Sequence, residues 1–331
     1  MNRRDWGKRV AVLVIAAAAV VAVSAGAAVV APGQAPADEP QDLPEYQPDR
    51  ITSDPIAAEG TVQPDRSAVQ GSGTVVIDAG HGNRFSRSDV QPLVEGLTKV
   101  GYDVEFYTSG DLGAQLEDAK AFVVIDPGKE YRSGDVEDVR KFTGQGGHLL
   151  VMGEPTRIQV SGGLFGVSLV EQQSAVTTLT SSYGMSVDTA YLYNQRTADT
   201  NYKFITTEPG SNADLGDVER TTMYTAAAVR AQGGTVLLRS SANTLTSSTD
   251  EETGQHPVAV RRNEVVLVGD KSFLGSGRYK VADNEAFVAY LVEFLGSSDR
   301  EPGTEISGDG GGSGGSSASP QPNDSGSPTA E

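Results

Sequence analysis

The chain has 331 residues and no cysteine, and its 44 acidic and 26 basic side chains give a formal net charge of −18. The absence of thiols excludes disulfides, thiolate metal sites and a cysteine nucleophile. The strong negative charge repels DNA and RNA, so we predict no nucleic-acid partner. Such an acidic composition is typical of proteins from salt-loving organisms, and it also fits an ordinary acidic secreted protein.

Residues 1–33 predict a signal anchor or an export signal. Within them, residues 10–30 form an uncharged apolar run, and roughly 20 such residues are enough to span a bilayer. Basic residues precede this run, so we expect the N-terminus inside the cell membrane and the domain on the external face. Cleavage after the Ala-x-Ala-like residues 35–37 would instead give a secreted protein.

The first residues also suggest an export route. Residues 2–8 read NRRDWGK and resemble a twin-arginine signal, with Trp6 where Phe is usual and Gly7 where Leu is usual. The resemblance implies that the domain folds in the cytoplasm and is then exported. If the signal is cleaved and the protein is secreted, the twin-arginine route is therefore a possible means of export.

Two other stretches have compositions unlike that of a folded core. Residues 34–72 are rich in Pro, acidic residues and Gln, which predicts an extended linker. Residues 298–331 are mostly Gly, Ser, Pro and acidic residues, which predicts a disordered tail. We therefore expect the folded α/β domain to occupy residues 73–297.

The first half of this domain alternates short apolar strands with amphipathic helices. Its predicted strands are 75–77, 103–107, 121–125 and 148–152. Its predicted helices are 88–100, 111–118 and 133–142, the last with Ser133 as its cap. This alternation is typical of a doubly wound, mainly parallel sheet that is covered by helices on both faces.

The second half has a less regular pattern. Residues 164–184 predict a helix followed by a loop, and residues 185–193 predict an extended segment. Further strands are predicted at 223–229, 235–239, 257–261 and 264–268, with a hairpin tip between the last two. A closing helix is predicted at 284–295, with Asp283 and Asn284 as its cap.

The first strand leads into the most informative motif of the chain, TVVIDAGHGN at residues 74–83. Ligands of open α/β sheets bind beyond the carboxyl ends of the strands, so we expect a site formed by Asp78, His81, Asn83 and Phe85. His81 could act there as an acid or base. Alternatively, the acidic and amide side chains only cap the turn, and the imidazole only hydrogen-bonds the loop.

Three acidic residues follow later strands and are expected to face the same crevice. They are Asp126, Glu154 and Asp270. Carboxylates in this arrangement could bind Ca²⁺ or Mg²⁺, but solvated or turn-capping roles are ordinary in so acidic a chain. Asp270 could pair with His81 or cap a turn. We predict a ligand-binding crevice with no cofactor and no metal.

Residues 76–82, VIDAGHG, resemble the opening of zinc-dependent N-acetylmuramoyl-alanine amidases. This resemblance implies that His81 would ligate zinc. Catalytic zinc needs three protein ligands, and this family supplies a Glu and a second His from a Ser-x-His-x-Asn motif. Neither His148 nor His256 stands in such a motif.

A second resemblance covers residues 74–296. It rests on HGNRFS at 81–86, on GQGGHLLVM at 144–152, and on VGDKSF at 268–273 followed by DNEAF at 283–287. These motifs resemble the GldG-like or intraflagellar-transport-type domain of the uncharacterised DUF 4350 family, which occurs in membrane proteins of haloarchaea and bacteria. The resemblance implies a flavodoxin-like, class I glutamine amidotransferase-like scaffold that lacks the catalytic cysteine of amidotransferases.

The relatives of that family include accessory subunits linked to ABC transporters. We therefore expect a membrane-anchored or exported, non-catalytic domain that binds a ligand or partner and serves a membrane transport complex or other envelope proteins. The alternative is a zinc-dependent, amidase-like hydrolase that uses His81. Geometry separates the two, because a hydrolase needs His81 beside a carboxylate or beside two more metal ligands, whereas a binding module needs only a crevice.

Overall fold

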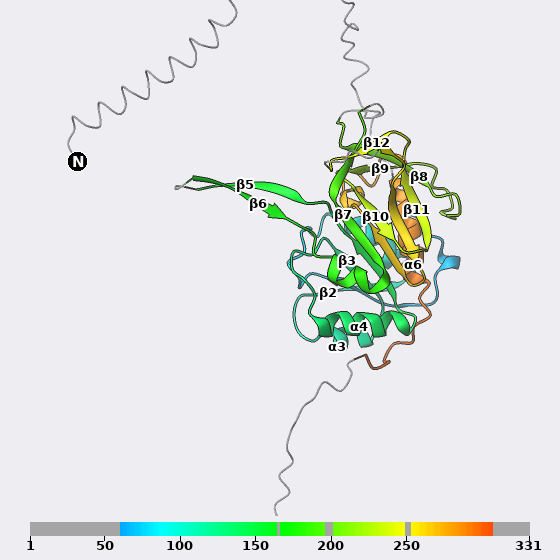
Figure 1. The fold of residues 1–331 in the computed structure, drawn as a ribbon. Coiled ribbons are helices and arrows are strands. Elements are labelled where there is room, and N and C mark those ends of the chain that lie inside the picture. The colour runs from blue at the N-terminus through cyan, green and yellow to red at the C-terminus, as the bar shows by residue number, and fades with distance from the viewer. Residues whose placement is uncertain (1–59, 164–165, 196–200, 249–252, 307–331) are drawn as a thin grey trace, which may run out of the picture. The chain divides into compact units, whose positions relative to one another are not determined.

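The computed structural model describes residues 60–163, 166–195, 201–248 and 253–306 (Figure 1). The chain divides into two units, Met1–Arg50 and Ile51–Glu331, and every described residue lies in the second. The predicted signal anchor therefore lies outside the described residues. No helix within those described ranges is both long and apolar enough to cross a bilayer.

A nine-stranded sheet forms the centre of the domain, in the order β2-β1-β3-β4-β15-β14-β11-β8-β9. The first five strands in this order are parallel, and the remaining four pair antiparallel. The parallel strands are β1 (Gly73–Asp78), β2 (Tyr102–Tyr107), β3 (Ala119–Ile125), β4 (His148–Met152) and β15 (Val265–Val268). The antiparallel strands are β8 (Phe204–Pro209), β9 (Thr221–Tyr224), β11 (Thr235–Ser240) and β14 (Pro257–Arg262).

The expected α/β fold is present, but the sheet is mixed and not mainly parallel. Its parallel core has the strand order 2-1-3-4-5 that is typical of flavodoxin-like folds, with β15 in the fifth place. The antiparallel half begins because β14 reaches β15 through a tight hairpin, and a tight hairpin can join only antiparallel strands. Asn263 adopts a φ of 53° at its tip.

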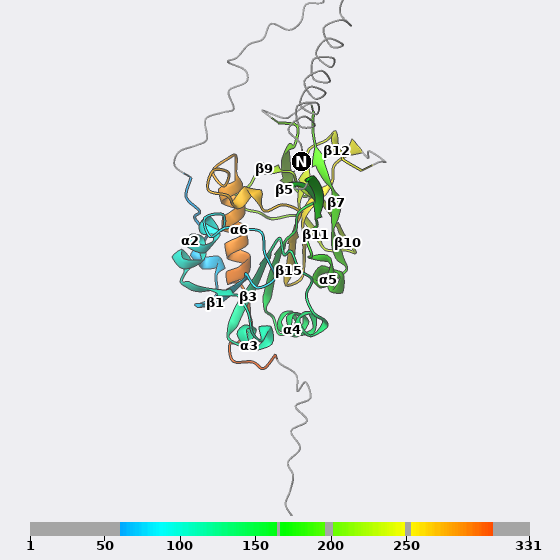
Figure 2. The same cartoon turned by 90° about the vertical axis from the view of Figure 1, so that its left-hand side faces the viewer.

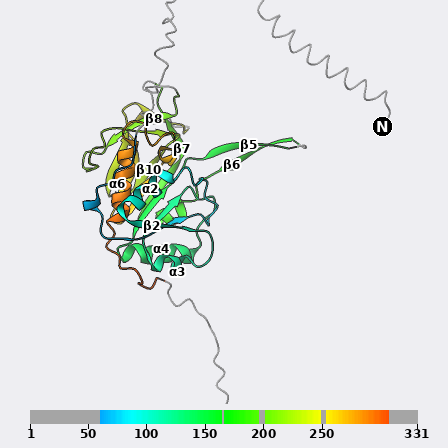
Figure 3. The ribbon, with the colours of Figure 1, turned by 180° about the vertical axis from the view of Figure 1, so that it is seen from behind.

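Helices cover both faces of the parallel core, as a doubly wound fold requires. The helices α2 (Gln91–Val100) and α6 (Asn284–Gly296) pack together on one face (Figure 3). The opposite face carries α3 (Leu112–Glu117) and α4 (Ser133–Gly144), seen at the bottom of Figure 2. Each face therefore has its own apolar core, and the strands between them are buried on both sides.

The helices follow the predicted apolar spacing closely, and Asp283 is the N-cap residue of α6 as predicted, but the side chains predicted to cap α4 and α6 do not bond to the helix N–H groups. In α2, Leu93 and Leu97 are fully buried, and Gly101 ends the helix with a φ of 98°. Ser133 is the first residue of α4 and does not cap it. Instead, the Asp135 carboxylate accepts a hydrogen bond of 3.2 Å from the backbone N–H of Arg132.

The cap predicted for α6 serves a tertiary contact instead. The Asp283 carboxylate accepts hydrogen bonds from the backbone N–H groups of Glu219 (3.0 Å) and Arg220 (2.8 Å). The Asn284 side chain accepts from the backbone N–H of Thr222 at 2.9 Å and donates to the carbonyl of the same residue at 3.0 Å. These two side chains therefore hold the chain leading into β9 against the start of α6, instead of satisfying the helix's own N–H groups.

The prediction of a helix across residues 164–184 is wrong. The chain forms an antiparallel hairpin there, β5 (Arg157–Gly163) with β6 (Gly166–Gln172), which projects from the body of the domain (Figure 1). Along β5, the apolar residues Ile158 and Val160 alternate with polar ones, which is the period of a strand. Only short helical turns follow, α5 (Thr177–Thr180) and a 3₁₀ turn.

A smaller sheet follows, in the order β10-β7-β12-β13. Its strands are β7 (Met185–Tyr193), β10 (Ala227–Ala231), β12 (Thr244–Thr246) and β13 (Thr253–Gly254). The strand predicted at 223–229 is split into β9 and β10, because Thr225 adopts a φ of 57°. β10 comes so close to the end of β15 that a Cβ on Gly269 would lie 2.1 Å from the Ala227 carbonyl oxygen.

Segments on both sides of the expected domain boundaries pack onto it. On the N-terminal side, Val62 is buried against α2 and α6. On the C-terminal side, Arg300 is completely buried and donates hydrogen bonds of 2.7 Å to the carbonyls of Glu117, Ala119 and Thr304. Composition assigned these residues to the linker and tail, yet the described part of the domain extends from residue 60 to Ile306.

We predict that Arg300→Ala lowers the stability of the domain by at least about 2 kcal/mol, because it leaves buried carbonyl oxygens without donors. The measurement is denaturant unfolding of the full chain. Arg140→Ala, on the exposed side of α4, is the matched control and should change stability by less than about 0.5 kcal/mol. Equal effects of the two substitutions would contradict this role of Arg300.

Candidate functional site

Four neighbouring parallel strands each lead into a buried acidic residue. Asp78 ends β1, Asp126 follows β3, Glu154 follows β4 and Asp270 follows β15. Their exposed fractions are 0%, 0%, 3% and 0%, respectively. Because parallel strands end at the same edge of a sheet, the predicted gathering of these acids at one edge is present. Their contacts, however, divide them into two groups.

The first group centres on Asp78, whose carboxylate accepts hydrogen bonds from four directions. The donors are the backbone N–H of Gly80 (3.0 Å), Nδ1 of His81 (3.0 Å to each oxygen), Nδ2 of Asn83 (3.1 Å) and the hydroxyl of Tyr131 (2.5 Å). The turn needs glycine at position 80, since a Cβ there would lie 2.8 Å from the Tyr107 ring. Asp78, His81 and Asn83 therefore converge as predicted, but they do so on one another.

The pKa values of this group follow from its burial and its contacts. Burial alone would raise the pKa of Asp78, but the hydrogen bonds from His81 and Tyr131 outweigh it and hold that pKa below its usual value. Asp78 is therefore ionised near neutral pH and can only accept, so Nδ1 of His81 carries a proton. Burial, together with the Asp78 carboxylate, raises the pKa of Tyr131 well above its usual value, which keeps its hydroxyl a donor.

The imidazole of His81 is enclosed on its other sides as well. Its ring stacks on Tyr131, with centroids 3.9 Å apart, and lies 6.1 Å from the ring of Tyr107. Its Nε2 lies 3.9 Å from a carboxylate oxygen of Asp135, and the side chain is only 12% exposed. His81 is thus held between two carboxylates and two tyrosines, with little of its surface open to a ligand.

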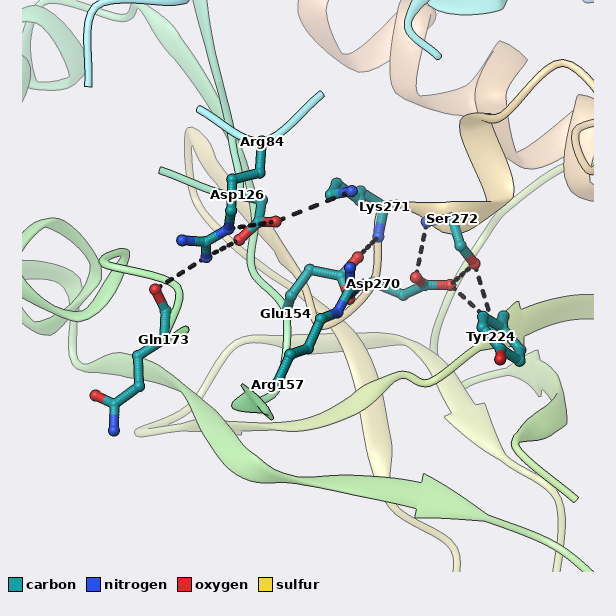
Figure 4. Close-up of polar contacts among 9 residues, drawn as sticks. All are labelled: Arg84, Asp126, Glu154, Arg157, Gln173, Tyr224, Asp270, Lys271 and Ser272. Carbon is teal, nitrogen blue, oxygen red and sulfur yellow. Dashed lines mark hydrogen bonds and ion pairs between the residues drawn. The ribbon is translucent and has the colours of Figure 1, made fainter. Parts of the chain in front are cut away.

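The second group begins at Asp126, in the turn after β3 (Figure 4). Arg84 pairs with both oxygens of this carboxylate, through Nη2 at 2.5 Å and Nε at 3.2 Å, and Nζ of Lys271 lies 3.9 Å away. Arg84 also donates to the carbonyl of Gln173 at 2.9 Å. Asp126 has a φ of 42°, a conformation that a non-glycine residue adopts only when its surroundings hold it.

Glu154 lies beside this pair and has partners of its own. Arg157, the first residue of β5, donates to one carboxylate oxygen, and the backbone N–H of Lys271 donates to the other at 3.1 Å. Burial and the neighbouring Asp270 carboxylate raise the pKa of Glu154 to about 8, against the opposing effect of Arg157. Glu154 therefore takes up a proton far more readily than an exposed glutamate does.

Asp270 caps the turn that follows β15 and does not contact His81. Its carboxylate accepts from the backbone N–H of Ser272 (2.7 Å), the hydroxyl of Ser272 (2.7 Å) and the backbone N–H of Tyr224 (3.2 Å). Burial raises the pKa of Asp270 as well. Of the two roles considered for this residue, turn capping is the one observed.

These contacts also bear on cation binding. Asp126, Glu154 and Asp270 are each engaged by donors within the protein, and Lys271 contacts both Asp126 and Glu154 (Figure 4). Across the described residues, no three His, Asp or Glu side chains converge in a way that could hold a metal ion. The second group therefore consists of mutually compensated charges and offers no ready-made set of oxygen ligands.

A cavity of about 950 Å³ lies next to these two groups. It is bounded by the start of α2, by β8 and by the loop that joins β15 to α6. Among the predicted site residues, Phe85 lines this cavity, whereas the predicted acids and His81 do not. Lys271 joins the two regions, because it lines the cavity and also lies beside Asp126.

Sequence reasoning missed most partners of the predicted residues. Tyr131 and Arg157 are distant from the motifs and carry no local signal that would identify them. Arg84 and Lys271 stand inside the motifs, beside Asn83 and Asp270, and a search for compensating cations would have found them. The Gly-rich residues 275–277, which line the cavity, are also visible in the sequence as a candidate binding loop.

The comparison with family models matches residues 90–292 to a domain of unknown function, DUF4350. This range covers more than half of the chain. The chain belongs to the DUF4350 family. No curated protein sequence matches this DUF4350 chain.

Solved structures resemble the DUF4350 domain at low sequence identity. The mmIFT52 N-terminal domain is 12% identical, with a TM-score of 0.52 over 69% of this chain and 99% of that one. A cytoplasmic protein from Salmonella typhimurium is 12% identical, with a TM-score of 0.46 over 69% and 100% of the two chains. A protein from Thermoplasma acidophilum, described as a GMP synthase subunit, is 8% identical, with a TM-score of 0.37 over 66% and 96%. Only the first of these scores supports a shared fold, and none of them bears on function.

We predict that Glu154 makes the stability of the domain fall as the pH rises. Its pKa is about 8 in the folded state against 4.5 for an unperturbed glutamate, so its contribution is complete below pH 4.5 and is lost as the pH rises through about 8. The midpoint temperature of thermal unfolding should therefore fall less steeply with rising pH in Glu154→Gln than in the unmodified chain. The exposed Glu130→Gln is the control and should leave the decline unchanged. Parallel profiles for Glu154→Gln and the unmodified chain would contradict the assignment.

Asp78 should act in the opposite direction. Its pKa is lowered in the folded state, so its contribution to stability is present above pH 3.8 and is lost as the pH falls below that value. Asp78→Asn should therefore flatten the acid limb of the same profile and leave the alkaline limb unchanged. A change on the alkaline limb alone would be inconsistent with an ionised Asp78.

Proposed function

We propose that the DUF4350 domain is a non-catalytic binding module whose ligand occupies the cavity beside the two acidic groups. One observation carries this proposal: a cavity of about 950 Å³ opens at the ligand-binding edge of the sheet, yet none of the predicted acids, nor His81, lines it. Small-molecule sites are typically cavities of roughly 300–1,000 Å³ with mixed apolar and polar walls. The cavity fits that description, and the titratable groups beside it are engaged with one another.

The membrane part of the proposal rests on sequence that lies outside the described residues. We propose that residues 10–30 anchor the chain in the membrane, with the domain on the external face. Alternatively, cleavage of the signal releases the chain, and the twin-arginine route is one means of its export. The binding module would then serve a transport complex or other envelope proteins. This wider role depends on the GldG-like, haloarchaeal type of resemblance, which is an analogy at the level of the fold.

A hydrolase that uses His81 is the second candidate, and one contact favours it. Nδ1 of His81 lies 3.0 Å from both oxygens of Asp78, which is the geometry by which a carboxylate orients a catalytic imidazole. Against this role, Nε2 faces Asp135 and the ring is stacked on Tyr131. The pair also lies apart from the residues that line the cavity. We therefore favour a positioning role for this Asp–His pair.

The cavity offers a substitution that tests binding without disturbing the core. Gly277 lines the cavity, and a Cβ at this position would meet no atom within 4 Å. We predict that Gly277→Phe obstructs part of the cavity, leaves the unfolding temperature of the chain nearly unchanged, and reduces the thermal stabilisation given by hits from a library of fragment-sized organic molecules. Gly134→Phe, on α4 and also in open space, is the matched control and should keep those hits.

The same hits separate the two candidate functions. A binding module returns each hit chemically unchanged after incubation, as mass spectrometry would show. Conversion of a hit by the unmodified chain, together with loss of that conversion in His81→Asn, would overturn the non-catalytic proposal. Stabilisation by the hits that survives in Gly277→Phe would place the ligand elsewhere.

A further inference from the structure

The cavity carries a charge opposite to that of the chain as a whole. Its described lining includes three cationic side chains, Arg220, Lys271 and Arg278, and a single acidic one, Asp89. The Asp89 carboxylate is already engaged, because it accepts a hydrogen bond of 2.7 Å from the backbone N–H of Ser86. In a chain of net charge −18, such a concentration of cations around one cavity requires an explanation.

Arg278 is the most constrained of these cations. Its guanidinium carbon lies 4.5 Å from the centroid of the Phe204 ring and 4.6 Å from that of Tyr224, so the two aromatic rings hold it in place. Among the described residues, no carboxylate lies within ion-pair distance of it. A guanidinium that is fixed by its faces keeps the N–H groups of its plane available to an anion.

Lys271 has no close ion-pair partner, although the buried carboxylates of Asp126, Glu154 and Asp270 all act on it. Its Nζ lies 3.9 Å from an oxygen of Asp126, and that carboxylate already receives two hydrogen bonds from Arg84. No carboxylate of the described residues lies within hydrogen-bond distance of this ammonium where it borders the cavity. Arg220 is exposed, and no carboxylate of the described residues pairs with it. The described lining therefore holds more cationic than acidic side chains, three against one.

The rest of the lining is both apolar and hydroxyl-bearing. Its apolar side chains include Phe85, Ile125, Phe204 and Leu274, and its hydroxyls include Thr206, Thr222, Ser241 and Ser276. The apolar walls favour a hydrocarbon or ring system, and the hydroxyls can donate to anionic oxygens. The lining therefore combines charge, hydrogen bonding and apolar contact around one space.

We propose that this cavity binds a small organic anion, with a carboxylate or phosphate group at Lys271 and Arg278 and an apolar or aromatic part against Phe85 and Phe204. This inference rests on the proposed binding function and specifies its ligand class. The anionic group of the ligand would lie close to the Lys271 ammonium, whose nearest ion-pair partner, Asp126, is 3.9 Å away. A neutral ligand of the same shape would leave both cations without a close partner and would bind less tightly.

Three probes with the same ring test the inference by isothermal titration calorimetry on the full chain. They are naphthamide, which is neutral, naphthoate, which is a carboxylate, and naphthyl phosphate. We expect one or both anions to bind at least about tenfold more tightly than the amide, since a hydrogen bond to a charged group contributes that much. Preference between the two anions identifies the acidic group as a carboxylate or a phosphate.

Substitutions then locate the anionic group. Lys271→Gln and Arg278→Gln should each weaken binding of the preferred anion by about tenfold and that of naphthamide far less. Arg278 also stacks on aromatic rings, so its replacement could disturb the fold. Lys271 makes no such contact, so an effect of both substitutions points to charge and not to misfolding. Lys129→Gln removes the same charge at an exposed position outside the cavity and should change neither affinity.

The outcomes separate this inference from the function on which it rests. Equal affinities for all three probes, each reduced by Gly277→Phe, would overturn the anion assignment and leave the binding function standing. Binding of none of the probes, or binding that Gly277→Phe does not reduce, would overturn both. A preference for an anion that disappears in both Lys271→Gln and Arg278→Gln supports both.

Discussion

Buried carboxylates at the carboxyl edge of the parallel sheet are the constraint on which the rest of this structure depends. Asp78, Asp126, Glu154 and Asp270 follow four neighbouring strands and are almost fully removed from water. An isolated charge in such a place costs several kcal/mol, so each acid must be paired, hydrogen-bonded or protonated. The loops that leave this edge are shaped by the need to bring those partners in.

The partners come from segments that are distant in sequence, so their contacts join the loops into one unit. Arg84 connects the loop after β1 with the turn after β3, and it reaches the carbonyl of Gln173 beyond the projecting hairpin. Lys271 connects the turn after β15 with both Asp126 and Glu154. These contacts also hold Lys271, which lines the neighbouring cavity, and a cavity with fixed walls is what the proposed ligand binding requires.

The pairing of these buried charges also accounts for the presence of an aspartate and a histidine of the kind used in catalysis. The Asp78–His81 pair has the contact expected of an acid–base couple, yet the two tyrosines and Asp135 enclose the imidazole. The cationic groups Arg220, Lys271 and Arg278 line the cavity, and of these only Lys271 also lies beside one of the buried acids, Asp126. The acids at the sheet edge and the cations of the cavity thus belong to two regions that Lys271 joins.

Local sequence patterns predicted the parallel core, because apolar periodicity and strand-end residues are local properties. The shared edge of Asp78, Asp126 and Glu154 follows from the same strand order. What the patterns could not predict depends on distant contacts. Tyr131 becomes part of the site only in the folded chain, through its hydrogen bond to Asp78 and its packing against His81. Residues 298–306 have a tail-like composition, yet they pack onto the domain, where Arg300 donates hydrogen bonds to buried carbonyls.

The hairpin of β5 and β6 was misread for a different reason. The alternation along β5 is short, and its strands pair with each other away from the main sheet, so nothing in the predicted sheet required them. The hairpin between β14 and β15 was predicted, but the pairing of β11, β8 and β9 beyond it was not, because strand order across a sheet is not a local property of the sequence. Tertiary pairing, not local preference, determines both features.

The division between the compensated sheet edge and the cavity is best tested by NMR chemical-shift mapping on the isotope-labelled full chain, during titration with the naphthyl anion that binds more tightly. We expect shifts at residues 85–90, 204–206 and 271–282, which surround the cavity, while His81 and Asp135 remain unchanged. Shifts centred on His81 and Asp135, with the cavity residues unaffected, would contradict the division between a compensated edge and a ligand-binding cavity.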